Sequence, residues 1–305
     1  MKAIVRAEGG ARLQSIDQSV SLADDDVLVD VRAVAICRTD LYAAEGKIKV
    51  RQGRVLGHEF TGVVAEVGYA VSEFRPGDRV VGNPSFHCGD CRECHAGTPH
   101  RCADTTFLGL DHDGAFAEQV VVPSWSLHSL PERIPFDVGT FVEPVAAGIA
   151  VLEAGLNQQN RVWVNGSGRI AKLTGEILGD AGFSDFFVSE TREISDGEVD
   201  GLIETCGLGG KMDALINALR PGGTLVLKSR EPIHAELPIL ETIRKQIRIV
   251  AVKYGPFEDA LDFVSRNVST LQSYLDSSWT LDDFEESFEK AANCEEKKLC
   301  FRVSD

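Results

Sequence analysis

Residues 162–171 read VWVNGSGRIA, a short apolar run followed by two glycines and the start of an amphipathic segment. The pattern G-x-G-x-x-G/A between a buried strand and a helix is typical of a dinucleotide-binding turn. The glycines let the backbone approach a pyrophosphate, which then lies at the helix N-terminus. The candidate cofactor-binding residues of this turn are Gly166, Ser167, Gly168, Arg169, Ile170 and Ala171.

Strand-like and helical patterns alternate around this turn, which indicates a doubly wound parallel sheet. The strand-like runs are 186–188, 201–204, 224–227 and 247–252. Residues 221–223 (PGG) are predicted to end a helix before the strand at 224–227. An apolar helix is predicted at 141–152, ending at Gly155. Before residue 135 the chain instead has short β-like runs broken by glycine and proline, at 27–36, 60–68, 78–82 and 120–122. These indicate a β-rich domain, a partly closed barrel.

The length of 305 residues fits two domains of ordinary size. We expect the β-rich domain to comprise 1–148 and 273–305, with a cysteine lobe at 86–103. The parallel-sheet domain is expected at 149–272. The tail beyond Trp279 then supplies a helix and a last strand that return to the first domain.

The charge excludes several function classes. With 31 Lys+Arg against 47 Asp+Glu the net charge is −16, which opposes binding to nucleic acid or to an anionic membrane. No run approaches the ~18 apolar residues of a membrane span, and residues 1–10 lack the apolar core of a signal peptide. We expect a soluble, cytoplasmic protein.

Four of the eight cysteines, in the pattern C-x2-C-x2-C-x7-C, predict a closed metal site. Four thiolates can complete a tetrahedral zinc site with no open position, which is typical of structural zinc. An iron–sulfur cluster, or unligated thiols and disulfides, are the alternatives. The predicted structural zinc ligands are Cys88, Cys91, Cys94 and Cys102.

A second, open metal site is indicated earlier in the chain. Cys37 follows one apolar strand, and His58 and Glu59 precede another. One thiolate, one imidazole and one carboxylate leave a coordination position free, as a catalytic zinc requires.

These motifs occur in an order that resembles the zinc-dependent medium-chain dehydrogenase/reductase family, which includes alcohol, sorbitol and threonine dehydrogenases. They are, in order, 57–62 (GHEFTG), 77–80 (GDRV), the cysteine lobe, 114–118 (GAFAE), 143–144 (EP) and the glycine turn. The resemblance implies an α/β fold: an N-terminal GroES-like, β-rich barrel that is the catalytic domain, and a Rossmann domain.

The resemblance also implies roles for residues near the open metal site. Cys37, His58 and Glu59 match the catalytic zinc site, and Glu143 stands where relatives bind zinc directly or through water. Which of Glu59 and Glu143 contacts the metal stays open.

Three neighbours in the chain complete the candidate catalytic set. The resemblance makes Thr39 the hydroxyl that relays the substrate proton and Asp40 a residue that orients a zinc ligand. Tyr42 replaces a histidine that often completes the relay, and it is a candidate for contact with substrate or ribose.

Further residues match the family's cofactor site. Glu190 lies nineteen residues after Ala171, near the ~20-residue interval of the acid that binds a ribose 2′-hydroxyl. An acid at this position favours NAD over NADP, whereas Arg192 nearby leaves NADP as an alternative cofactor. The remaining candidates are Arg38, at a pyrophosphate-binding position, and Cys206 and Gly207, after a later strand.

The Rossmann domain is predicted to be shortened. Only about a dozen residues separate the strand ending near Ser189 from the next one, whereas a βαβ unit needs roughly 30. A helix, a strand and a further helix present in relatives are therefore inferred to be missing.

The leading hypothesis is a zinc-dependent oxidoreductase that transfers a hydride between NAD(H) and a secondary alcohol, polyol, sugar or amino-alcohol and its ketone. Two zinc ions per chain and a homodimer or homotetramer are expected. The alternative is a relative that retains zinc but catalyses redox-neutral chemistry such as epimerisation, or a cofactor-poor binding protein. A non-enzymatic partner of nucleic acid is a third class, opposed by the charge.

Overall fold

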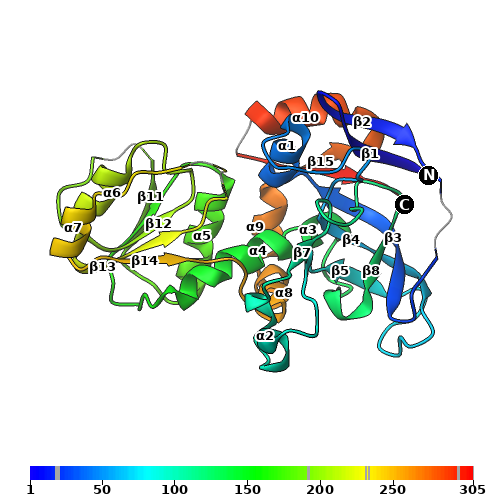
Figure 1. Cartoon of the computed structure of the whole chain (residues 1–305), viewed down its shortest axis with the longest axis horizontal. Coiled ribbons are helices and arrows are strands. Elements are labelled where there is room, and N and C mark those ends of the chain that lie inside the picture. The colour runs from blue at the N-terminus through cyan, green and yellow to red at the C-terminus, as the bar shows by residue number, and fades with distance from the viewer. Residues whose placement is uncertain (18–20, 191–192, 231, 233, 294–295, 305) are drawn as a thin grey trace. The chain divides into compact units, whose positions relative to one another are not determined.

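The structure, a computed structural model, describes residues 1–17, 21–190, 193–230, 232, 234–293 and 296–304 (Figure 1). It divides into two compact units, residues 1–143 with 261–305 and residues 144–260. Within the described ranges no helix combines the length and the apolar character that crossing a bilayer requires. The predicted fold class, a GroES-like β domain with a Rossmann sheet, is confirmed.

The first unit is built on a large sheet whose central strand is β3 (Asp26–Ala35). In the described residues the sheet order is β15-β16-β3-β4-β5-β9, and β8 also pairs with β3. The other strands are β4 (Glu59–Val67), β5 (Arg79–Gly82), β8 (Gln119–Pro123), β9 (Leu127–Ser129), β15 (Leu275–Trp279) and β16 (Lys298–Arg302).

The smaller elements of this unit surround that sheet. The additional strands are β1 (Lys2–Ala7), β2 (Gly10–Ser15), β6 (Ser85–Phe86) and β7 (Thr106–Phe107). The helices are α1 (Arg38–Glu45), α2 (Arg92–His95), α3 (Phe136–Gly139), α9 (Val268–Ser273) and α10 (Phe284–Asn293). Short 3-10 turns are η1 (Pro99–Arg101), η2 (Ser124–Ser126) and η4 (Leu281–Asp283).

The register of β3 brings distant parts of the chain together. Its last residue, Ala35, pairs with Glu59 of β4 on one side and with Cys300 of β16 on the other. Cys37 follows two residues later, so residues near 37, 59 and 298 meet at one end of the sheet. The interior behind them is apolar, with Val34, Phe60 and Phe301 at 1% exposure or less.

The second unit contains a fully parallel sheet in the order β11-β10-β12-β13-β14. Its strands are β10 (Val162–Asn165), β11 (Phe186–Ser189), β12 (Val199–Glu204), β13 (Leu219–Leu227) and β14 (Arg248–Ala251). The helices that belong to it or begin in it are α4 (Val142–Ile149), α5 (Arg169–Asp180), α6 (Met212–Ala218), α7 (Ile239–Arg244) and α8 (Phe257–Arg266), with η3 (Ala150–Ala154) after α4.

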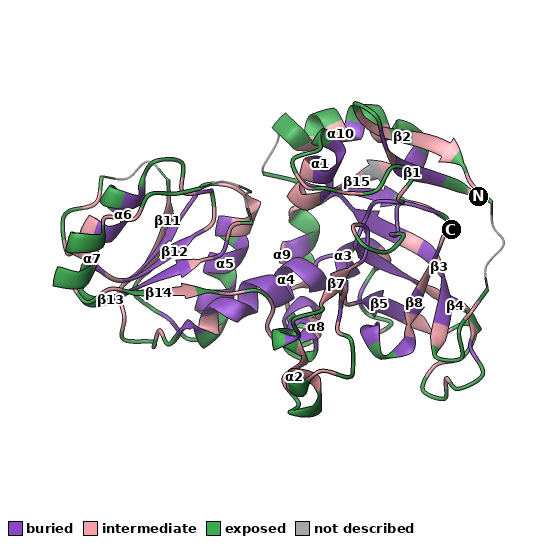
Figure 2. Cartoon of the chain, in the orientation of Figure 1, coloured by how far each residue is buried: buried purple, intermediate pink, exposed green. Residues whose placement is uncertain are grey.

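Side-chain alternation explains why this sheet is covered on both faces. Val164 packs with Leu178 of α5 in one core, whereas the preceding Trp163 packs with Leu215 of α6 in another. Both cores are buried, and the central strands are largely purple in Figure 2. Such two-sided burial is what a doubly wound sheet requires.

The predicted shortening of the Rossmann domain concerns the connection between β11 and β12. Among the described residues of that connection, 190 and 193–198, there is no helix or strand. The described sheet therefore ends at β11, where a further strand would otherwise pair.

The helix predicted at 141–152 and expected to end at Gly155 is confirmed: α4 reaches Ile149, η3 follows directly, and Gly155 ends it in the left-handed region with φ at 81°. One local expectation was wrong. The predicted break at 221–223 lies inside β13. A register shift against β12 between Val199 and Gly201 accommodates it, because an irregularity can absorb residues without ending the strand.

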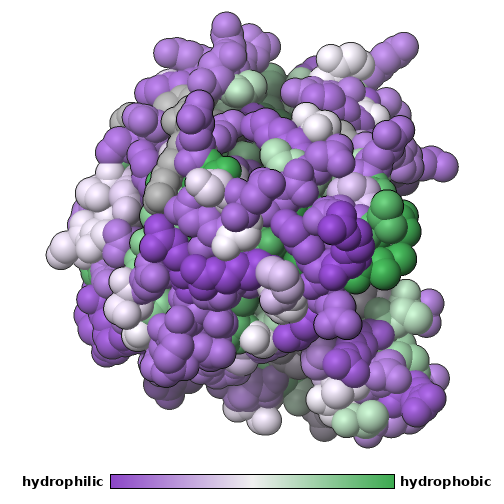
Figure 3. All heavy atoms as spheres, turned by 90° about the vertical axis from the view of Figure 1, so that its left-hand side faces the viewer, coloured by the Kyte–Doolittle hydropathy of each residue, from purple (hydrophilic) through white to green (hydrophobic). Residues whose placement is uncertain are grey.

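Large exposed apolar side chains of the second unit lie on α7 and on the edge strand β14. They are Ile239, Leu240, Ile243 and Ile249. The molecular face drawn in Figure 3 is otherwise mostly hydrophilic, as expected from the net charge, with one compact hydrophobic group.

Candidate functional site

Asp40 is the residue that holds the open metal site together. It lies in the first turn of α1 and is fully buried. Its Oδ2 accepts the backbone N–H of Cys37 at 2.9 Å, and its Oδ1 accepts that of Gly57 at 3.1 Å. The same Oδ1 lies 3.1 Å from His58 Nδ1. One carboxylate therefore fixes Cys37 and His58, which are 21 residues apart in the chain.

The other ring nitrogen of His58 is suited to metal binding. Because a carboxylate only accepts hydrogen bonds, Nδ1 is the donor to Asp40 and Nε2 is left with its lone pair. Among the described residues this buried Nε2 has no hydrogen-bond partner. Burial lowers the pKa of His58, but the charges of Asp40 and Cys37 outweigh it and raise that pKa well above its usual 6.5.

Cys37, His58 and Glu59 form a cluster that fits a metal ion. One ligand atom from each lies within 4.8 Å of the others. Sulfur, imidazole nitrogen and carboxylate oxygen are the donors that zinc takes in catalytic sites, and three protein ligands leave a position open. The orphaned Nε2 and this donor set together fit zinc.

Lys298 is a site residue that the sequence did not indicate. It is fully buried on β16, and its Nζ pairs with Glu59 Oε2, itself 2% exposed. The Nζ also lies 5.4 Å from the centre of the Phe141 ring. The pair joins residues 239 positions apart, so no local pattern could have found it.

The two candidate carboxylates have different surroundings. Burial raises the pKa of Glu59, Lys298 opposes the rise, and the charge of Glu143 adds to it. Glu143 is 3% exposed in the first turn of α4. Glu59 belongs to the cluster with Cys37 and His58, whereas Glu143 is near enough to influence Glu59 electrostatically.

The other candidates on α1 lie around this centre. Thr39 Oγ1 is 3.7 Å from the Cys37 sulfur, which suits a hydroxyl beside a metal ligand. Tyr42 is half-buried, and Lys47 Nζ lies 5.3 Å from the centre of its ring. Arg38 donates to the backbone carbonyl of Ala292 at 3.3 Å. The roles of these residues remain predictions.

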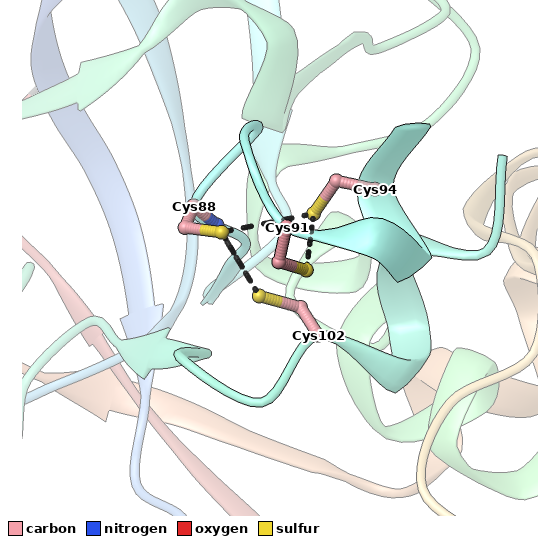
Figure 4. Close-up of side chains that lie close together, drawn as sticks. All are labelled: Cys88, Cys91, Cys94 and Cys102. Carbon is pink, nitrogen blue, oxygen red and sulfur yellow. Dashed lines mark hydrogen bonds between the residues drawn. The ribbon is translucent and has the colours of Figure 1, made fainter. Parts of the chain in front are cut away.

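The cysteine lobe presents four sulfur atoms to one point (Figure 4). Three of the Sγ–Sγ separations are 3.5, 3.5 and 3.9 Å. A tetrahedron with Zn–S bonds of about 2.3 Å has edges of about 3.8 Å, so the spacing fits zinc. These separations exclude disulfides between those pairs. The lobe is formed by Cys88, Cys91, Cys94 and Cys102.

Backbone geometry favours thiolate character in part of this lobe. The Cys88 N–H donates to Cys102 Sγ at 3.4 Å and lowers the pKa of Cys102 to about 7. Burial and the neighbouring sulfurs instead raise the pKa of Cys94 to about 12. The four thiols are therefore not equivalent without metal, and a cation would favour ionisation of all four.

The glycine turn connects β10 to α5 in the second unit. Gly166 has φ at 147° and lies against Thr205, so a side chain there would collide with the Thr205 hydroxyl. The helix cap, Gly168, makes no side-chain capping bond. Backbone N–H groups at the first turn of α5 are thus available to an anion, which fits a pyrophosphate.

Glu190 lies next to this turn. Its Oε2 accepts a hydrogen bond from Ser167 Oγ at 2.8 Å, and its Oε1 lies 3.4 Å from Lys211 Nζ. The Ser167 bond, with Lys211, lowers the pKa of Glu190. Arg192, predicted to keep NADP open, lies outside the described residues.

The loop after β12 completes the turn's surroundings. Cys206 is exposed, with Sγ 3.2 Å from Asn165 Oδ1. The buried Glu204, which the sequence did not single out, accepts the Gly207 N–H at 2.5 Å and the Ser229 hydroxyl at 2.7 Å. Through these hydrogen bonds Glu204 connects the loop after β12 with the loop after β13, at the carboxyl end of the sheet.

Comparison with known proteins shows which domain and which enzymes the chain is similar to. Residues 23–132 match the alcohol dehydrogenase GroES-like domain. The L-threonine 3-dehydrogenase of Xanthomonas euvesicatoria is 32% identical over 200 residues, which cover 63% of this chain and 58% of that enzyme. The threonine dehydrogenase of Coxiella burnetii is 34% identical over 176 residues, covering 55% and 51%. The chain is thus similar to alcohol dehydrogenase GroES-like domains and to L-threonine 3-dehydrogenases over these residues.

Solved structures of dehydrogenases share the fold of this chain. A putative zinc-binding dehydrogenase from Sinorhizobium meliloti, bound to NADP, is 26% identical, with a TM-score of 0.86 over 99% of this chain and 98% of the other. Galactitol-1-phosphate dehydrogenase from Escherichia coli, at 22% identity and a TM-score of 0.85 over 99% and 100%, shares the fold. The chain aligns with 58% of the length of the Xanthomonas enzyme.

The cysteine lobe can be tested by metal analysis. Replacing Cys91→Ser removes one sulfur from a closed four-sulfur site, so we expect zinc to fall from two ions per chain to one and the Tm to drop. Cys206→Ser, at an exposed cysteine outside both clusters, is the control and should keep two. Unchanged zinc in Cys91→Ser would contradict the assignment.

The Lys298–Glu59 pair can be tested by unfolding. Replacing Lys298→Met leaves a carboxylate buried without its cation, which we expect to lower the free energy of unfolding by about 3–5 kcal/mol. The control is the exposed neighbour Lys297→Met, with an expected change within about 0.5 kcal/mol. Urea denaturation measures both, and equal stabilities of the two variants would refute the role given to Lys298.

The raised pKa of His58 predicts proton release on metal binding. The metal-free site holds the His58 proton up to a pH above 6.5, and zinc must displace it from Nε2. Calorimetric titration of zinc in buffers of different ionisation enthalpy should therefore show a His58-dependent proton release. This release should diminish as pH rises through the folded-state pKa. A release identical in wild type and His58→Gln would disprove it.

Proposed function

We propose that this chain is a zinc-dependent dehydrogenase that oxidises a secondary alcohol or reduces the corresponding ketone with NAD(H). The observation that carries the proposal is the buried, unpartnered Nε2 of His58 beside Cys37 and Glu59, within the described residues. Two domains are proposed, a catalytic one at 1–148 and 273–305 and a dinucleotide-binding one at 149–272.

The metal ligands of the proposed reaction are Cys37, His58 and a carboxylate. Zinc held by them would act as a Lewis acid that polarises the substrate hydroxyl. We propose that Glu59 uses the oxygen that Lys298 does not engage, because breaking the pair would leave a buried ammonium without its partner. Glu143 is the second candidate, and its position beside Glu59 keeps it within electrostatic reach.

The protein's own residues would move the proton and hold the cofactor. Thr39, with its hydroxyl next to the Cys37 sulfur, accepts the substrate proton and passes it outward. Asp40 keeps His58 in the tautomer that presents Nε2. The nicotinamide cofactor supplies hydride transfer, while the glycine turn binds its pyrophosphate and Glu190 its ribose. Arg38, Cys206 and Gly207 are proposed to border the cofactor.

The proposed substrate class is a polyol, a sugar or an amino-alcohol. Two supports are the Glu143–Pro144 match and the named activity of the threonine dehydrogenases at 32–34% identity. Tyr42, at the position of a relay histidine, is proposed to contact substrate or ribose.

The decisive experiment combines metal analysis with nucleotide binding. We expect two zinc ions per chain, calorimetric binding of NAD, and NAD-dependent oxidation of a panel of polyols and of L-threonine. His58→Gln should lose one zinc and the oxidation but retain NAD binding, since the glycine turn is unchanged. A wild type that binds neither NAD nor NADP, or that lacks the second zinc, would refute the proposal.

A second candidate function is redox-neutral chemistry or binding without turnover. The observation that favours it is the short connection between β11 and β12, where we predict that part of a usual Rossmann domain is missing. Conversion of a polyol or sugar to its epimer without net NADH production, followed by NMR of the product, would support it over net dehydrogenation.

We also propose self-association as a homodimer or homotetramer in the cytoplasm. The support is the exposed apolar set on α7 next to the edge strand β14, including Leu240 at 74% exposure. Exposed apolar side chains beside an open sheet edge favour pairing with another copy. A monomeric mass of the wild type by light scattering would rule this out.

A further inference from the structure

Lys211 occupies a position that the sequence gave no reason to select. It lies in the loop between β12 and α6, and its Nζ is 3.4 Å from Glu190 Oε1. The other carboxylate oxygen of Glu190 accepts the Ser167 hydroxyl from the glycine turn. A cation, a carboxylate and a hydroxyl from three different loops thus meet beside the start of α5.

The loop that carries Lys211 is anchored to the cofactor turn. Thr205 donates its backbone N–H, at 3.1 Å, and its hydroxyl, at 2.8 Å, to the carbonyl of Asn165, the last residue of β10. The backbone N–H of Lys211 donates a hydrogen bond to the Leu208 carbonyl at 2.7 Å, which forms a turn. In the described sheet β12 and β11 lie on opposite sides of β10, so this loop passes the end of β10 to reach Glu190.

The charges at this position bear on the ribose of a dinucleotide. An acid at the end of the second strand accepts the ribose 2′-hydroxyl of NAD and repels the 2′-phosphate of NADP. An ammonium group within reach of that acid offsets the repulsion and can itself bind a phosphate. Glu190, Lys211 and Ser167 are all exposed, so a ligand can approach each of them.

We propose that Lys211 is a specificity-determining residue for the 2′ position of the adenosine ribose. With NAD, Glu190 accepts the 2′-hydroxyl and Lys211 moves aside. With NADP, Lys211 and the Ser167 hydroxyl donate to the 2′-phosphate and screen it from Glu190. The chain therefore binds both cofactors. This inference rests on the proposed dinucleotide binding.

Calorimetry on the full-length, zinc-loaded chain tests the inference without relying on turnover. The ligands are NAD, NADP, adenosine 5′-monophosphate and adenosine 2′,5′-bisphosphate. Lys211→Met should weaken NADP and the bisphosphate by about tenfold, the usual effect of a hydrogen bond to a charged group. NAD and the monophosphate should change by less than about twofold, since neither carries the 2′-phosphate.

Two further variants separate this role from a structural one. Lys211→Arg should restore the affinity for NADP, because it keeps the charge. Glu190→Gln should raise that affinity by removing the repulsion. The matched control is Arg220→Met, which removes an exposed cation paired with Asp200 at 2.9 Å near the opposite end of β12 and should alter neither affinity.

Salt provides an independent readout. The difference between wild type and Lys211→Met for NADP should shrink as ionic strength rises, because exposed charges are screened. Equal effects of Lys211→Met on NAD and NADP, or no effect on either, would overturn the proposal while leaving the dehydrogenase function intact. A wild type that binds neither nucleotide would overturn both.

Discussion

The Asp40 carboxylate is the constraint on which the candidate metal site of the first unit depends. It accepts two backbone N–H groups and the ring N–H of His58, so both oxygens are satisfied although the residue is fully buried. Such a group is costly to bury unless it is fully paired. The start of α1 and the segment before β4 therefore cannot shift independently. This fixed geometry leaves His58, whose Nε2 has no hydrogen-bond partner among the described residues, in the cluster with Cys37 and Glu59.

Charge compensation extends from this point to the far end of the sequence. Glu59 begins β4 next to His58, and Lys298 on β16 supplies its counter-charge in the interior. Because an unpaired buried charge is strongly destabilising, the pairing makes β16 part of the proposed metal centre. Zinc would add positive charge to a site that already contains Cys37, Asp40 and Glu59. In the proposed centre, Lys298 and zinc would together balance these acids.

Much of the site could be predicted because it is encoded locally. The lobe from Cys88 to Cys102 spans fifteen residues, and the glycine turn is read between a strand and a helix. Lys298 and Lys211 escaped prediction for another reason. Each is an ordinary lysine in the sequence, and only the strand order brings it to Glu59 or Glu190. The helix predicted at 141–152 was placed correctly, but its last turn is a 3-10 turn, because apolar spacing does not distinguish an α-helix from a following 3-10 turn.

The insertion of the second unit into the first has a consequence for how the protein folds. Glu59 and its partner on β16 are separated by 239 positions, and residues 144–260 lie between them in the chain. During synthesis, Cys37, Asp40 and His58 emerge long before Lys298. The β domain can therefore complete its sheet only after the whole second unit has left the ribosome. Closure of so long a loop is slow, and a nascent chain would hold Glu59 without its counter-charge until the end.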